Sequence, residues 1–137
     1  MTDAERLSEA AWTGDLTIIK DLIAAGVDIN APSAEGRWPP LHLAIENQRI
    51  DVIRWLLVAG ADVNRNMSGG WTPLVHAIDI ESDAAVQAGT LSEEMPIVLV
   101  ALLLSAGAIP TTEALEIARR YQNYRVLELL QQYTSRG

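Results

Sequence analysis

The sequence contains no cysteine. The chain therefore has no disulfide, no thiolate nucleophile and no thiolate ligand for a metal ion or an iron–sulfur cluster. Its only histidines are His42 and His76, and no glycine-rich loop follows a predicted strand. Nucleophilic triads and phosphate-binding loops therefore lack their parts. We expect a protein that is not an enzyme, needs no cofactor and holds its fold by side-chain packing alone.

The sequence also lacks a hydrophobic run long enough to span a bilayer. Its most apolar stretch, MPIVLVALLLSAGAIP, is too short for a membrane span and is predicted to contain a buried helix. The first residues, MTDAERLSEAAWTGD, are acidic and lack the basic head and apolar run of a signal peptide. We expect a cytoplasmic protein of one domain, because 137 residues with 49% hydrophobic side chains can bury a continuous core.

Positive charge is scarce. No lysine or arginine occurs between Arg65 and Arg119, and the formal net charge of the chain is -8. The acidic residues of that span are Asp79, Glu81, Asp83, Glu93, Glu94, Glu113 and Glu116. Such a balance repels nucleic acid and anionic membranes and favours a basic or neutral partner. We therefore expect a protein or peptide partner, no nucleic acid and no membrane. The sequence is silent on the oligomeric state, and a monomer is the working expectation.

A repeated pattern runs through most of the chain. The phrase PLHLAI begins at Pro40 and PLVHAI begins at Pro73, a spacing of about 33 residues. A second phrase recurs as IIKDLIAAGVDIN, VIRWLLVAGADVN and LVALLLSAGAIPT, with Gly26, Gly60 and Gly107 at the same place. The apolar spacing within these phrases is helical, and glycine suits the left-handed residue that follows a helix. Extra acidic residues precede the third copy.

These phrases resemble the ankyrin repeat, whose unit is a β-turn followed by two antiparallel helices and whose first helix opens with Thr-Pro-Leu-His-x-Ala. WTPLVHA keeps this opening from Thr72, but its histidine, His76, lies one place later. PPLHLA keeps the histidine, His42, but has Pro39 where threonine is usual. The resemblance implies an all-α solenoid of stacked helix-turn-helix units with β-turn connections. It also implies a structural role for His42.

We predict one domain over residues 1–137, built from four repeat units. The first, about 2–31, starts with a Thr2/Glu5 capping box and is the N-terminal cap. The second covers 32–65, the third covers 66–110 with an acidic insertion at about 82–95, and the polar last unit, 111–137, is the C-terminal cap. Good helix formers precede Gly89, so the insertion is expected to lengthen the first helix of its unit or to add a short helix.

Candidate binding residues follow from the same repeat pattern. Trp38 and Trp71 lie just before the helix-opening phrases, and the resemblance implies that this place, like the end of each first helix, faces a concave groove. Tryptophan is the commonest interface hot-spot residue. The favoured hypothesis is a non-enzymatic interaction module whose groove holds a basic or neutral peptide or protein surface. The predicted partner-binding residues are Trp12, Trp38, Glu46, Asn47, Trp71, His76, Asp79, Glu81, Asp83 and Tyr121.

Three alternatives remain open. If the helix that opens the third unit continues past Ile78, then His76, Asp79 and Asp83 share one face and could hold a divalent metal ion, with hydrolytic activity as a further option. The acidic residues could instead serve solubility alone, with the tryptophan rings packed into turns. A scaffold that meets its partner through other faces is the third alternative.

Overall fold

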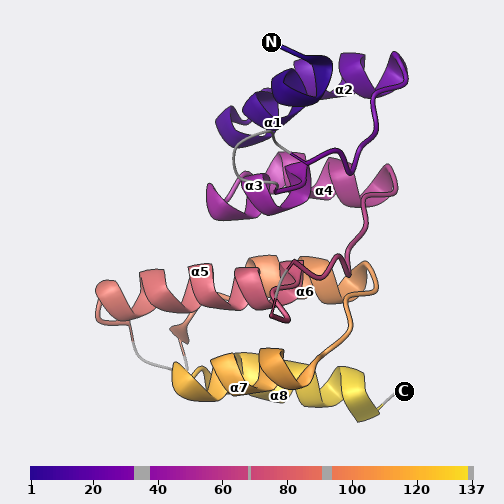
Figure 1. The fold of residues 1–137 in the computed structure, drawn as a ribbon. Helices are drawn as coiled ribbons and strands as arrows, with labels where there is room; N and C mark the ends of the chain where they lie inside the picture. The colour runs from indigo at the N-terminus through magenta and orange to yellow at the C-terminus, as the bar shows by residue number, and fades with distance from the viewer. Residues whose placement is uncertain (33–37, 68, 91–93, 136–137) are drawn as a thin grey trace. The chain divides into compact units, whose positions relative to one another are not determined.

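The computed structural model describes residues 1–32, 38–67, 69–90 and 94–135, and within them the chain forms eight helices and no strand. The helices are α1 (Asp3–Thr13), α2 (Leu16–Ala24), α3 (Pro40–Glu46), α4 (Ile50–Val58), α5 (Pro73–Gln87), α6 (Val98–Ser105), α7 (Thr112–Arg120) and α8 (Tyr124–Ser135). They follow one another as pairs, α1/α2 to α7/α8 (Figure 1). The predicted all-α class is confirmed.

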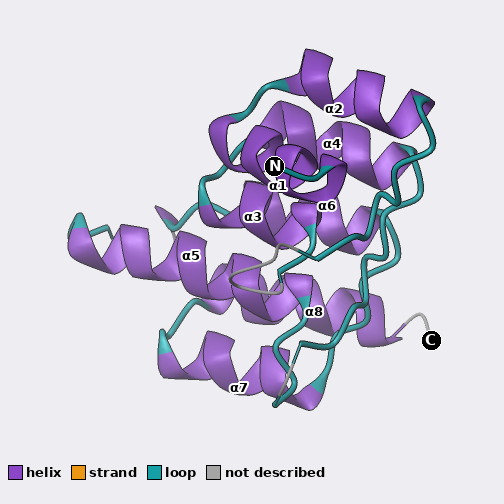
Figure 2. Ribbon diagram, turned by 45° about the horizontal axis from the view of Figure 1, so that its top comes forward, coloured by secondary structure: helices purple, strands orange, loops and turns teal. Residues whose placement is uncertain are grey.

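The chain divides into two compact units, unit 1 (Met1–Asp62) and unit 2 (Val63–Gly137). In unit 1 the helices of each pair pack on one another, and α1 packs on α3. Unit 2 has the same arrangement: α5 packs on α6, α7 packs on α8, and α5 packs on α7. Loops join the helices within each unit (Figure 2). Each unit is therefore two stacked helix pairs in which the first helix of one pair lies against the first helix of the next.

Local signals begin and end the helices as the sequence predicts. The Thr2 hydroxyl accepts the N–H of Glu5 at 3.1 Å and the Glu5 carboxylate accepts the N–H of Thr2, which completes the capping box of α1. Thr72 caps α5 directly before Pro73. The glycines predicted to follow the second helices have φ angles of 96° at Gly26, 101° at Gly60 and 102° at Gly107. Glycine adopts such angles without steric cost, so these positions end the helices cleanly.

Aliphatic side chains fill the interior of each unit. The large side chains that are fully buried in unit 1 include Leu7, Ile19, Ile45, Ile53 and Leu56. Those in unit 2 include Leu74, Ile78, Leu99, Leu103 and Leu130. Burying one such side chain stabilises a fold by about 1.5–3 kcal/mol, so the shared face between two helix pairs supplies most of the cohesion.

Across the described ranges, no helix combines the length and apolar character needed to cross a membrane.

The acidic insertion lengthens α5. This helix has 15 residues, whereas the other first helices, α1, α3 and α7, have 11, 7 and 9. It runs through Asp83 to Gln87, and Gly89 follows with a φ of 72°. Residues 91–93 of the predicted insertion lie outside the described residues. The longer first helix, one of the two forms that the sequence left open, is observed in the described residues of the insertion.

Candidate functional site

Trp12 lies at the end of α1 with 45% of its surface exposed. Its carbonyl oxygen accepts two side-chain hydrogen bonds from the turn between α3 and α4, from Asn47 Nδ2 at 2.8 Å and from Arg49 Nε at 3.1 Å. The last carbonyl groups of a helix have no partner inside the helix, so these donors satisfy one of them. The two bonds tie the end of α1 to the second helix pair while the indole ring stays at the surface.

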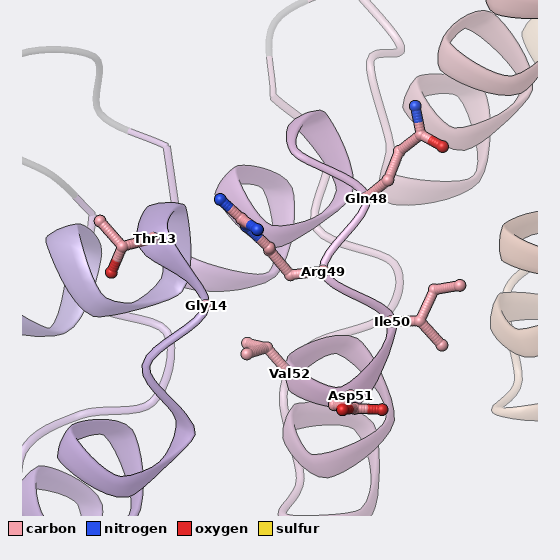
Figure 3. Close-up of a pocket in the computed structure, with 7 residues that line it drawn as sticks. All are labelled: Thr13, Gly14, Gln48, Arg49, Ile50, Asp51 and Val52. Carbon is pink, nitrogen blue, oxygen red and sulfur yellow. The ribbon is translucent and has the colours of Figure 1, made fainter.

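A depression of about 300 Å³ lies between the α1–α2 and α3–α4 turns of unit 1 (Figure 3). It is lined by Thr13, Gly14, Gln48, Arg49, Ile50, Asp51 and Val52. Gly14 has a φ of 88°, and a Cβ atom there would lie 3.0 Å from Arg49 Cδ. Because Gly14 has no side chain, the Arg49 side chain can lie across the α1–α2 turn. This depression is not evident in the sequence, because two turns that are far apart along the chain form it.

Trp38 and Trp71 are both half-buried, each before the first helix of its pair. The Trp38 ring lies 6.1 Å from the His42 ring, and the Trp71 ring lies 5.6 Å from the His76 ring, measured between centroids. Both histidines are buried, at 0% and 1% exposure. The one-place shift of His76 in the sequence therefore does not prevent the same ring pairing. Each tryptophan is partly packed into its turn and partly exposed.

Asp79, Asp83 and Tyr121 come together in unit 2. The Tyr121 hydroxyl donates to Asp79 Oδ1 at 2.8 Å. Burial, this hydrogen bond and the negative charges of Asp79 and Asp83 raise the pKa of Tyr121 to about 12, although Arg120 acts in the opposite direction. Asp79 is half-buried and Asp83 is exposed. These three residues thus form one polar group where α5 meets the end of α7.

Glu81 lies in the interior of unit 2, with 5% of its surface exposed. Its two carboxylate oxygens accept the N–H of Leu99 at 3.0 Å and of Val100 at 3.1 Å, in the first turn of α6. Burial raises the pKa of Glu81, and the backbone hydrogen bonds only partly offset that rise. Glu81 therefore caps α6 from a neighbouring helix. Glu81 was expected at the rim of the groove, but it lies in the interior. His76 was expected to contact a partner, but it is buried as well.

Two further polar contacts were not foreseen from the sequence. Asn123 Nδ2 donates to Ser82 Oγ at 3.0 Å, and Asn123 Oδ1 accepts the N–H of Val126 at 3.2 Å, so Asn123 joins α5 to the start of α8. Arg125 Nη1 donates to the carbonyl of Met95 at 2.8 Å. An asparagine just before a predicted helix is a local capping signal, but its link to Ser82 is not local. Both contacts fasten the surroundings of the insertion to the last helix pair.

The metal-site alternative is wrong for the residues that it named. Helix α5 does continue past Ile78, as that hypothesis required. However, among the residues that the structure describes, no three His, Cys, Asp or Glu side chains are grouped so that they could hold a metal ion. His76 lies instead against Trp71, and Asp79 accepts a hydrogen bond from Tyr121.

Comparison with known proteins gives one family and several partial relatives. A family profile described as ankyrin repeats, in three copies, matches residues 7–88. The 2-5A-dependent ribonuclease of Mus musculus is 33% identical over 75 residues, which are 55% of this chain and 10% of that protein. Ankyrin repeat domain-containing protein 40 of Mus musculus is 38% identical over 53 residues, 39% of this chain and 15% of that protein. A potassium channel of Arabidopsis thaliana is 39% identical over 64 residues, 47% of this chain and 7% of that protein. The match thus spans only a small part of each relative.

Proposed function

Because this chain belongs to the ankyrin repeat family, we propose that it is a non-enzymatic binding module whose partner is a protein or peptide with a basic or neutral surface. Repeats of this family are in general protein–protein interaction modules without catalytic activity. The similarity to a ribonuclease and to a potassium channel covers a tenth or less of those proteins. Their chemistry is therefore no part of the proposal.

The position of Trp12 carries the proposal. An aromatic side chain that is 45% exposed has apolar surface available to a partner. Tryptophan is also the residue most enriched among interface hot spots. The hydrogen bonds from Asn47 and Arg49 to the Trp12 carbonyl hold the backbone in place before a partner arrives. Less freedom is then lost on binding, which favours affinity.

Charge supports the basic or neutral character of the partner. In unit 1, Glu46 and Asn47 end α3 beside the anchored carbonyl of Trp12. In unit 2, Asp79, Asp83 and Tyr121 form one polar group, and neither α5 nor α6 contains a lysine or arginine. Surface charge of one sign speeds the encounter with a partner of the opposite sign. The proposed contact residues are Trp12, Trp38, Glu46, Asn47, Trp71, Asp79, Asp83 and Tyr121, and the buried His76 and Glu81 are left out.

The test is to identify the partner by cross-linking and mass spectrometry, and then to measure binding kinetics by surface plasmon resonance. Trp12→Ala should raise the off-rate about tenfold or more, because an aromatic anchor that the partner covers sets the residence time of the complex. Replacing Asp79 and Asp83 together by asparagine should lower the on-rate, and added salt should lower the wild-type on-rate.

Tyr124→Ala is the matched control, since Tyr124 is an aromatic residue with 58% exposure outside the proposed contact set. It should leave both rate constants unchanged. If Trp12→Ala binds like the wild type and melts at the same temperature, Trp12 is no anchor and the proposed site in unit 1 is wrong.

A further inference from the structure

Arg49 is a surface cation that the fold holds in place. It is exposed, and its Nε–H donates to the Trp12 carbonyl at 3.1 Å. Gly14 leaves room for the Arg49 side chain, because a Cβ atom there would lie 3.0 Å from Arg49 Cδ. Figure 3 shows the side chain extending from the α3–α4 turn toward Thr13 and Gly14. The guanidinium group is therefore fixed at the depression between the two turns.

The charge of Arg49 is not neutralised within the described part of the chain. No acidic side chain there forms an ion pair with it, although the chain has a formal net charge of -8. Asp51 lines the same depression, but its carboxylate forms no ion pair with Arg49. Since Nε is already used, the two Nη groups remain as donors. Such a pair of donors matches the two oxygens of a carboxylate.

We propose that the Trp12–Arg49 corner, meaning the Trp12 ring, the Arg49 guanidinium and the adjoining depression, binds an aspartate or glutamate side chain of the protein partner. This inference rests on the proposed function and names one contact within it. The carboxylate pairs with the Nη groups of Arg49, and neighbouring partner residues cover the Trp12 ring. A depression of about 300 Å³ has room for one such side chain. Tryptophan and arginine are both enriched among hot-spot residues, and here they are hydrogen-bonded neighbours.

The test uses a random peptide library displayed on yeast and selected against the full chain. The selected peptides should share an acidic residue, and changing it to its amide should weaken binding about tenfold, the loss of one well-placed charge-assisted pair. Arg49→Gln should cause a similar loss, and the two changes together should cost little more than either alone. Such non-additivity identifies a direct pair. Arg54→Gln is the matched control, because Arg54 is an exposed arginine on α4 outside the depression.

A charge exchange completes the test. Arg49→Glu should abolish binding of the selected peptides, and a peptide with lysine in place of the acidic residue should restore it. If Arg49→Gln lowers the melting temperature, the acid-to-amide change in the peptide still tests the proposed ion pair, because that change leaves the protein unaltered. Peptides that need Trp12 or Trp71 but tolerate Arg49→Gln would overturn this inference and leave the proposed function standing. A selection that yields no binding peptide contradicts both.

Discussion

The Glu81 side chain, which belongs to α5, caps the N-terminus of α6. Its oxygens accept the N–H groups of Leu99 and Val100, and Ile97, the residue before α6, has no polar side chain to do so. The first N–H groups of a helix lack partners inside the helix, and negative charge is favourable at that end. Asp83, two residues further along the same acidic stretch, is exposed. Glu81 therefore caps a helix in the interior, whereas Asp83, two residues later, stays at the surface.

At pH 4.5, Glu81→Gln should lower the free energy of unfolding by about 1–3 kcal/mol, because the amide turns an NH2 group toward one of two buried N–H donors and leaves that donor without an acceptor. Urea denaturation followed by circular dichroism measures the change. Asp83→Asn is the control, and it should alter stability by less than about 0.5 kcal/mol, as expected for an exposed position. An equal effect of the two substitutions would show that Glu81 is not a cap in solution.

The same carboxyl group predicts a pH dependence. Burial raises the pKa of Glu81 above its usual value of 4.5. The folded state therefore binds this proton more tightly than the unfolded state, so the contribution is fully present below pH 4.5 and is lost as pH rises through the folded pKa. The stability difference between wild type and Glu81→Gln should shrink as pH rises from 4.5 to 7. Urea denaturation of both proteins across this range measures it, and a difference that grows with pH contradicts the raised pKa.

At the scale of an element, the long helix α5 holds the ends of the other three helices of unit 2. Asp79 accepts from Tyr121 at the end of α7, and Glu81 caps the start of α6. Ser82 accepts from Asn123, which caps the start of α8. Asp79 and Glu81 precede the predicted insertion, and Ser82 is its first residue. The added length of α5 thus extends a helix that already organises its neighbours.

Asn123→Ala should destabilise the protein by about 1–3 kcal/mol, since it removes the cap of α8 and leaves the buried Ser82 hydroxyl without its donor. Thermal and urea unfolding measure the loss. Gln131→Ala, at an exposed position of α8, is the control and should be nearly neutral. The Ser82→Ala and Asn123→Ala pair should be non-additive, and simple additivity would refute the bond between them.

At the scale of the whole molecule, we propose that the repeats unfold as one domain. The stability of a repeat array is the sum of the repeats and of the interfaces between neighbours, and a short array commonly melts in one step. Leu56→Ala in unit 1 and Leu103→Ala in unit 2 each remove a fully buried side chain. Each should cost about 2–5 kcal/mol. Calorimetry should show a single unfolding transition, and each substitution should lower its temperature. Two transitions, with each substitution shifting only the transition of its own unit, would show that the units unfold independently.

Much of the fold could be predicted because its signals are local. The capping box at Thr2 and Glu5, the Thr72 cap before Pro73 and the positive φ of Gly60 all depend on residues within a few positions of one another. The repeat spacing then predicts how many times the helix pair recurs, and the family match over residues 7–88 confirms that resemblance. Helix formers followed by Gly89 also predicted extra helix at the insertion, either as a longer first helix or as a short additional one, and the structure has the longer α5.

The sequence by itself determined that the chain is built from repeated helix pairs, that Thr2 and Thr72 begin helices, and that Gly26, Gly60 and Gly107 follow helix ends. Only the tertiary structure decided which polar residues remain at the surface. Glu81 is buried because it meets Leu99, 18 residues away, and Trp12 is anchored by Asn47, 35 residues away. Periodicity records which face of a helix is apolar, but it does not record which neighbour a polar side chain will reach. That choice depends on how two helix pairs pack, so acids that look equivalent in sequence, such as Glu81 and Asp83, separate into a buried cap and an exposed charge.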